Sequence, residues 1–189
     1  MKNNKNQNKK SKPQEESNEE PEMKKLEIKA YDSSKKAHEG QLRDEGTPYF
    51  EHVERVAKQV LENCDSQAYI TALLHDVLED TDYTYDNLKK EYSEEIAKDV
   101  LLLTKKEGES FEDYMKKLVV KYAPFYIKLV DRLDNIKSLP ACGSDEKISK
   151  YLKETENEFL PIAKSSRYSK LDEFDVLIKE IEAGCKALK

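Results

Sequence analysis

The stretch ALLHDVLED, residues 72–80, carries four ionisable side chains within six positions of an otherwise apolar segment. An α-helix turns by about 100° per residue, so with His75 at 0° Glu79 lies at about 40°, Asp76 at about 100° and Asp80 at about 140°. The four side chains thus share one arc of a predicted helix. Such an arc is usually a solvated face, but an adjacent imidazole and carboxylate are also ready ligands for a divalent metal.

A second histidine precedes this stretch, in PYFEHVERVAKQVL, residues 48–61. At helical spacing, the apolar residues that follow His52 form an arc beside it, so the imidazole lies at the edge of a buried face. A lone histidine in that position is more often a hydrogen-bonded structural residue. His75 offers it a partner, which favours a metal site.

A third polar group follows in YIKLVDRLDNIKSL, residues 126–139, where Asp131 and Asn135 share one helix face. A solvated face, with Arg132 paired to a neighbouring acid, is the alternative. Two histidines and two aspartates from three helices would form a mixed nitrogen and oxygen site, suited to Mn²⁺, Fe²⁺ or Zn²⁺ better than to Ca²⁺. Because such an ion lowers the pKa of bound water to roughly 7, hydrolysis is the natural reaction.

Helical spacing of apolar residues continues along the chain, and strand-like alternation is nearly absent, which predicts an all-α fold. The 189 residues suffice for one domain. Residues 1–24 contain almost nothing to bury, so we predict a disordered polar tail followed by a domain over residues 25–189. The predicted helices span roughly 26–39, 49–63, 66–79, 84–91, 93–104, 110–122, 124–139, 145–159 and 170–187.

Charge and cysteine usage limit the partners and the compartment. The net charge is −6 with both signs interspersed, so a nucleic-acid-binding surface is not expected. The three cysteines form no CxxC pair, which indicates reduced thiols, and no apolar run is long enough to span a membrane. We predict a cytoplasmic protein with no membrane partner; the sequence makes no prediction of its oligomeric state.

Taken together, the motifs resemble the HD superfamily of metal-dependent phosphohydrolases, and more narrowly the hydrolase domain of RelA/SpoT-type proteins and the small alarmone hydrolases. The resemblance spans about residues 30–163 and implies an HD-domain helical bundle. It also implies removal of the 3′-pyrophosphate from guanosine tetra- or pentaphosphate, giving GDP or GTP and pyrophosphate. The motifs that carry it are HEGQLR, GTPYFEH, ALLHDVLEDT, EIAKDVLLLTK, KLVDRLDNIKSL and YLKETENEFLPIA.

Matched by position, the resemblance implies specific site residues. A single Mn²⁺ would be held by His52, His75, Asp76 and Asp131. Glu79 and Asp80 would orient and deprotonate the attacking water. The small-molecule nucleotide would be contacted by Arg43 at the guanine, by Asn135 and Tyr151 at the ribose, by Lys147 at a phosphate, and by Ser138 in the same pocket.

Three positions depart from the residues usual in this family, and we expect none of them to touch a proposed ligand. Asp44 replaces a lysine, Val53 a proline and Asp134 a histidine. Asp44 removes a positive charge close to where an anionic nucleotide would bind, which favours an alternative, namely an HD-type phosphohydrolase acting on another nucleotide or phosphate metabolite. A module that binds a nucleotide without cleaving it is the third hypothesis, and the complete set of ligand and water-handling residues ranks it last.

Overall fold

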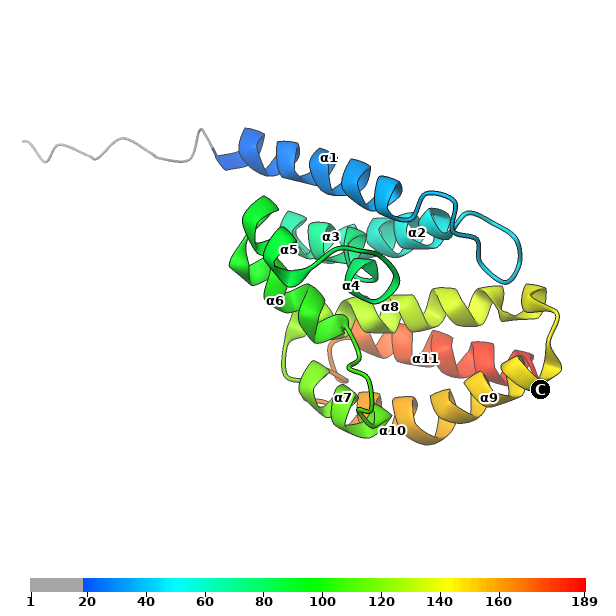
Figure 1. Ribbon diagram of the computed structural model, residues 1–189. Coiled ribbons are helices and arrows are strands. Elements are labelled where there is room, and N and C mark those ends of the chain that lie inside the picture. Colours follow the sequence, from blue (N-terminus) through cyan, green and yellow to red (C-terminus); the bar gives the residue numbers. More distant parts are fainter. Residues whose placement is uncertain (1–18) are drawn as a thin grey trace, which may run out of the picture.

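Helix α8, Tyr122–Ser138, runs through the middle of the structure, with other helices on either side of it (Figure 1). The computed structural model describes residues 19–189, and all regular elements in this range are helices, which confirms the all-α prediction. The remaining elements are α1 (Glu19–Ala37), α2 (Tyr49–Leu61), α3 (Ser66–Leu73), α4 (Val77–Asp80), α5 (Tyr85–Glu91), α6 (Glu94–Leu103), α7 (Phe111–Leu118), the 3₁₀ turn η1 (Leu139–Cys142), α9 (Asp145–Glu154), the π-helical turn η2 (Thr155–Phe159), α10 (Leu160–Ser165) and α11 (Asp172–Ala187).

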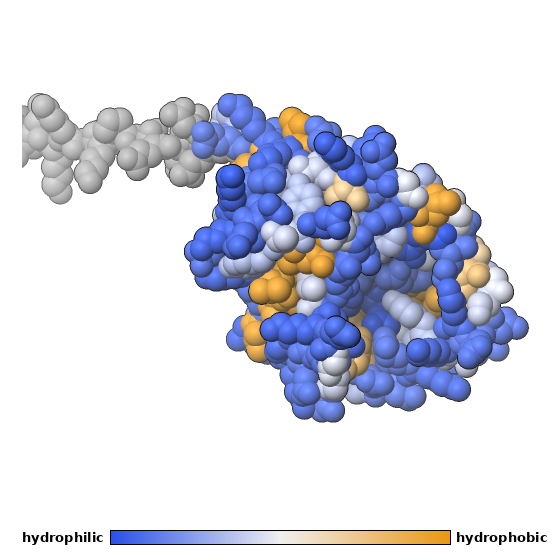
Figure 2. Space-filling model, viewed as in Figure 1, coloured by the Kyte–Doolittle hydropathy of each residue, from blue (hydrophilic) through white to orange (hydrophobic). Residues whose placement is uncertain are grey.

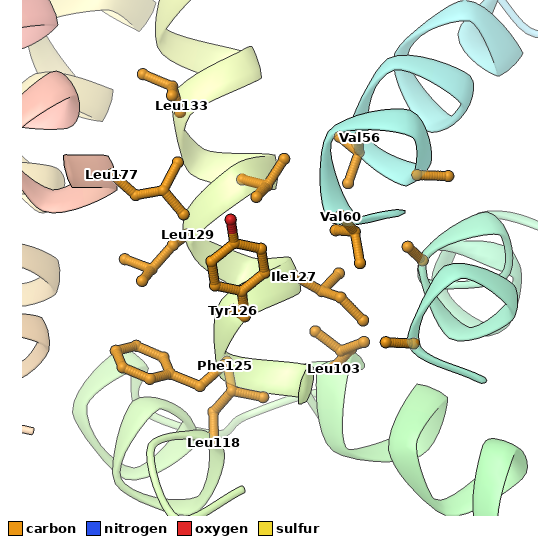
Figure 3. Packing of buried hydrophobic residues seen from close by; sticks show 14 of the residues in the cluster. Val56, Val60, Leu103, Leu118, Phe125, Tyr126, Ile127, Leu129, Leu133 and Leu177 are labelled. Carbon is orange, nitrogen blue, oxygen red and sulfur yellow. The ribbon is translucent and has the colours of Figure 1, made fainter. Parts of the chain in front are cut away.

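The sequence of α8 explains its central position. A helix that is apolar around most of its circumference is normally buried between neighbours, and α8 packs against α2 and α3 as well as against α11. Figure 3 shows Val60 of α2 directed toward Ile127, while Leu177 of α11 lies close to Leu129 on another side of α8. The polar residues of α8 are therefore carried on a central, largely buried helix.

The first helix begins earlier than the sequence pattern predicted. Helix α1 begins at Glu19, so residues 19–24 belong to it and not to the predicted tail. Met23 packs against the core and Lys24 pairs with Glu27 at 2.6 Å, one helical turn away, so these residues gain contacts that composition alone did not reveal. Residues 1–18 of the predicted tail lie outside the described residues.

The helix predicted over 66–79 is interrupted at residues 74–76, which form a turn between α3 and α4. In a continuous α-helix the Ala72 carbonyl would accept the amide of Asp76. Here the side chain of His75 takes that carbonyl, with Nδ1 2.8 Å from the Ala72 oxygen. A polar side chain that bonds to the local backbone competes with the helix in this way.

The helix predicted over 145–159 also differs from the structure. It is α-helical only to Glu154, widens into the π turn η2, and continues as α10, which was not predicted. Pro161 lacks an amide hydrogen and its ring crowds the preceding turn, so regular α-helical bonding cannot pass through this segment.

The helices and the cysteines bear on the predicted compartment. Within residues 19–189, no helix combines the length and apolar character needed to cross a lipid bilayer. Cys64, Cys142 and Cys185 are free thiols. The cytoplasmic location remains a prediction.

Phe174 anchors α11 to α8. Its ring is fully buried, with centroids 5.0 Å from Tyr122, 5.5 Å from Phe125, 5.3 Å from Tyr126 and 5.3 Å from Tyr168. Aromatic pairs at such distances add to the free energy gained by burying the rings.

Phe174→Ala is expected to lower the free energy of unfolding by about 3–5 kcal/mol, because it removes a buried ring and leaves a cavity. Val176→Ala, on the exposed face of the same helix, is the matched control and should change it by less than about 0.5 kcal/mol. Chemical denaturation followed by circular dichroism measures both. Equal effects of the two substitutions would contradict this account of α11.

Candidate metal centre and adjoining pocket

The four side chains predicted as ligands, namely His52, His75, Asp76 and Asp131, meet between α2, the turn at residues 74–76 and α8. His52 Nε2 lies 3.2 Å from Asp131 Oδ1, and His75 Nε2 lies 4.0 Å from the same oxygen. Asp76 Oδ2 is 3.0 Å from His75 Nε2 and 3.9 Å from His52 Nε2. One atom each from His52, His75 and Asp131 lies within 4.8 Å of the others, so these residues could hold a metal ion.

The hydrogen bond that breaks the helix also sets the direction of His75. Its Nδ1 is the donor to the Ala72 carbonyl, which leaves Nε2 as the free nitrogen that faces the two aspartates. That nitrogen is buried and makes no hydrogen bond of suitable geometry within residues 19–189. A buried polar atom without a partner is costly, and a metal ion would satisfy it.

The charges of the site favour a cation. Burial disfavours a charged imidazole, but the Asp76 carboxylate outweighs this and raises the pKa of His75 to about 9. Burial likewise opposes a charged Asp131, yet Lys128 and the two histidines hold the pKa of Asp131 well below its usual value. The aspartates are therefore anionic, and metal binding would take the place of protons on the histidines.

His52 is held by Asp134, so the expectation that none of the three departures touches a proposed ligand is wrong. Asp134 Oδ2 lies 2.6 Å from His52 Nδ1, and Arg55 donates to both Asp134 oxygens at 2.8 and 3.0 Å. Burial opposes ionisation, but the bonds from His52 and Arg55 hold the pKa of Asp134 at about 2. A carboxylate behind a ligating histidine fixes its tautomer and orients its free nitrogen.

Asp131 is fixed by two neighbours on its own helix. Lys128 donates to Asp131 Oδ2 at 2.8 Å, and Asn135 donates to Asp131 Oδ1 at 2.6 Å. Lys128 was not among the predicted site residues. It lies one turn before Asp131, at a spacing that would have suggested the contact.

Tyr49, also not predicted, links a proposed ligand to the proposed water-handling pair. Its hydroxyl lies 2.7 Å from Asp76 Oδ2 and 2.9 Å from Asp80 Oδ2, and its ring stacks on the buried His38 at 4.9 Å. Burial and the two carboxylates keep the pKa of this phenol far above its ordinary value, so it stays a donor. With one proton, it donates to one carboxylate at a time.

Glu79 lies at the edge of the site and is tied to the loop after α6. Its Oε1 accepts the backbone amide of Lys105 at 2.5 Å. Loss of water around the carboxylate raises the pKa of Glu79, and the nearby Asp76 and Asp80 add to the shift, while the Lys105 amide and Lys128 oppose it. A carboxylate with a raised pKa is better suited to accept a proton near neutral pH.

A pocket of about 480 Å³ adjoins the candidate metal site, and all five predicted substrate residues line it: Arg43, Asn135, Ser138, Lys147 and Tyr151. It lies between the loop after α1, the end of α8 and helix α9. Figure 2 shows a hollowed, largely hydrophilic surface on this face of the molecule.

The loop after α1 reaches the pocket because Gly46, with φ of 83°, turns the chain back in a conformation that favours glycine. Backbone bonds from Arg43 to Thr47 and from Tyr49 to Gln41 close the loop. The Arg43 guanidinium then donates to Asn135 at 2.9 Å and to Ser138 at 2.8 Å.

Arg132 supports the opposite wall of the pocket. Its guanidinium is buried, 4.4 Å from the centre of the Tyr151 ring, and it donates to Glu154 at 3.0 Å and to Thr155 at 3.1 Å. Arg132 thus pairs with an acid, as the alternative proposed, but the solvated face of that alternative is wrong, because Arg132 is buried against the Tyr151 ring while Glu154 is half-exposed.

The chain is similar to known proteins in sequence and in fold. Residues 30–166 match the family model described as an HD domain. A protein of Aquifex aeolicus named guanosine-3′,5′-bis(diphosphate) 3′-pyrophosphohydrolase is 39% identical over 145 residues, 71% of this chain and 20% of that protein. The bifunctional (p)ppGpp synthase/hydrolase SpoT of Escherichia coli K12 is 31% identical over 146 residues, 71% of this chain and 21% of that protein. The chain therefore spans about a fifth of the length of these curated relatives.

A solved structure described as "A metazoan ortholog of SpoT hydrolyzes ppGpp and plays a role in starvation responses" has the same fold. It superposes with a TM-score of 0.70 at 20% identity, over 87% of this chain and 97% of that chain.

Asp134→Asn is expected to weaken divalent-metal binding about 10- to 100-fold, because a neutral amide orients His52 less firmly and makes its free nitrogen less basic. Titration of metal-free protein with Mn²⁺, followed by calorimetry, measures this without any activity. Arg55→Met leaves the bond between Asp134 and His52 in place and is the control. An unchanged affinity in folded Asp134→Asn protein would show that Asp134 does not support the site.

Proposed function

This chain belongs to the HD-domain family, and from that premise we propose that it is a metal-dependent hydrolase. The proposed reaction removes the 3′-pyrophosphate of guanosine tetra- or pentaphosphate and gives GDP or GTP and pyrophosphate. The observation that carries the proposal is the direct connection between metal site and pocket. Asn135 bonds to Asp131 on one side and to Arg43 on the other, and Tyr49 lines the pocket while bonding to Asp76.

Because the two are connected, one ligand can occupy the pocket and the metal site at the same time. With its nucleoside in the pocket, where Arg43 and Tyr151 offer a planar cation and a ring, a phosphate group can lie against the metal site. The relatives named above as acting on guanosine 3′,5′-bis(diphosphate) support this choice of substrate.

The proposed metal is a single Mn²⁺, held by His52, His75, Asp76 and Asp131. Bound there, it would supply Lewis acidity and lower the pKa of water. The mixed nitrogen and oxygen donors suit Mn²⁺, and also Fe²⁺ or Zn²⁺, better than Ca²⁺.

The residues around the site have separate tasks in this proposal. Glu79 accepts the proton of the attacking water, and Asp80, held beside it by Tyr49, orients that water. The water oxygen bonds to the phosphorus nearest the ribose, and the ribose 3′ oxygen departs with the electrons of the broken bond and takes up a proton, which leaves the 3′ hydroxyl of the nucleotide and free pyrophosphate. Lys128, already beside Asp131, offsets the negative charge that builds up on the phosphate.

Protein loaded with Mn²⁺ is expected to release pyrophosphate, and not single phosphate, from guanosine tetraphosphate, and chelation should stop the reaction. Asp76→Ala and Asp131→Ala should abolish turnover because each removes a metal ligand. Asp113→Ala, at the first turn of α7, is the matched control and should keep wild-type turnover. A folded, metal-replete sample that turns over no guanosine tetraphosphate would refute the substrate assignment.

Glu79→Gln is expected to lower kcat by about 100- to 10,000-fold, because the amide cannot accept a proton. In the wild type, activity should fall as the pH drops through the raised pKa of Glu79, since the protonated acid is no base. That fall should therefore begin at a higher pH than for an ordinary glutamate, and Glu79→Gln should lose this limb of the profile.

Two controls keep this pH experiment specific. Metal content measured over the same pH range separates protonation of Glu79 from loss of the ion, and Glu107→Gln makes the same change on an exposed loop. An acid limb that persists in Glu79→Gln protein at constant metal content would assign the base to another group.

A further inference from the structure

An ion pair lies at the outer rim of the pocket and involves Asp44, one of the three positions that depart from the residues usual in the family. Lys147 Nζ of α9 lies 2.9 and 3.0 Å from the two carboxylate oxygens of Asp44, which is on the loop after α1. Both residues line the pocket, and their side chains are 62% and 53% exposed. Asp44 therefore does more than remove a positive charge. It forms an ion pair with Lys147, the residue proposed to contact a phosphate.

The remaining charges of the pocket are nearly balanced. Three cations and three carboxylates line it, and Arg43 is already paired with Glu45 at 2.9 Å. Glu154 is paired with the buried Arg132. Among the described residues that line the pocket, Lys150 is the cation left without a carboxylate within ion-pair distance.

The pocket has an inner and an outer end. Tyr49 and Asn135 mark the inner end, because they bond to Asp76 and Asp131 of the metal site. Asp44 and Lys147 mark the exposed rim. A nucleotide whose 3′ phosphates lie at the metal site would thus direct its 5′ phosphates toward this rim.

We propose that Asp44 limits the negative charge that the outer end of the pocket accepts, and so selects substrates with fewer 5′ phosphates. This inference rests on the proposed function. It assigns a preference for guanosine tetraphosphate, which ends in a 5′-diphosphate, over the pentaphosphate, which ends in a 5′-triphosphate.

The physical basis is the weakness of an exposed ion pair. Such pairs contribute little to stability, so Lys147 can exchange Asp44 for a phosphate at small cost. The Asp44 carboxylate is then left unpaired beside the phosphates, and each added phosphate increases the like-charge repulsion. If the pair served only to tie the loop to α9, its loss would affect both substrates equally.

Asp44→Asn keeps the shape of the side chain and removes its charge. This substitution is expected to raise the ratio of kcat/KM for pentaphosphate to kcat/KM for tetraphosphate about three- to ten-fold. A factor of this size corresponds to the repulsion between one carboxylate and one further phosphate in a solvated pocket. The ratio cancels any general loss of folded or metal-loaded protein. The effect should shrink as the salt concentration rises. Asp145→Asn makes the same charge change in the first turn of α9, outside the pocket lining, and should leave the ratio unchanged.

Lys147→Met separates charge selection from a structural tie. It breaks the same ion pair but removes the cation, so the ratio should fall instead of rising. Opposite shifts in Asp44→Asn and Lys147→Met support the proposal. An unchanged ratio in Asp44→Asn, or shifts of the same sign in both variants, would overturn it.

Binding measurements keep this test independent of the hydrolase proposal. GDP and GTP carry the same 5′ groups but no 3′ pyrophosphate, so calorimetry on chelated protein reports the outer end of the pocket without turnover. Asp44→Asn should raise the affinity for GTP relative to GDP by a similar factor. If neither tetraphosphate nor pentaphosphate is hydrolysed, the proposed function fails, and this affinity ratio still decides the role of Asp44. Absence of binding by both nucleotides would overturn the role of Asp44 as well.

Discussion

Asp131 is a buried carboxylate on the central helix α8, and a buried carboxylate must be matched by positive charge and hydrogen bonds. Lys128, Asn135 and His52 provide this match from two helices. The same requirement brings α2 and the turn at residues 74–76 against α8 at this point. The arrangement that satisfies Asp131 is therefore also the arrangement that could hold a divalent ion.

The same helices carry both the core and the candidate site. In α8, Leu129 lies close to Leu177 of α11 (Figure 3), while Asp131 faces the candidate metal site and Asn135 lines the pocket. Helices α2 and α8 and the turn at residues 74–76 thus hold the proposed ligands, whereas Asp44 lies on a loop at the rim. This separation allows the charge of the pocket to change without disturbing the metal site.

Sequence pattern predicted correctly those features that depend on residues close together in the chain. Helical periodicity predicted most helices to within a few residues, since burial of one face repeats along the chain. It failed at residues 74–76, where a side chain of the helix itself takes a backbone carbonyl, and at Pro161, where the helix widens before continuing. Asp134 was treated as a departure from a pattern, although it bonds to His52, because that contact joins residues 82 positions apart.

The sequence by itself determined the all-α class, the identity of the histidines and aspartates, and their division among three segments, because residue type and helical period are properties of short stretches. Only the tertiary structure decided which nitrogen of His75 faces the aspartates. It also decided that Tyr49 bonds to Asp76, that Asp134 bonds to His52, and that Asp44 pairs with Lys147. Those relations depend on distances between side chains from different segments, and packing sets these distances.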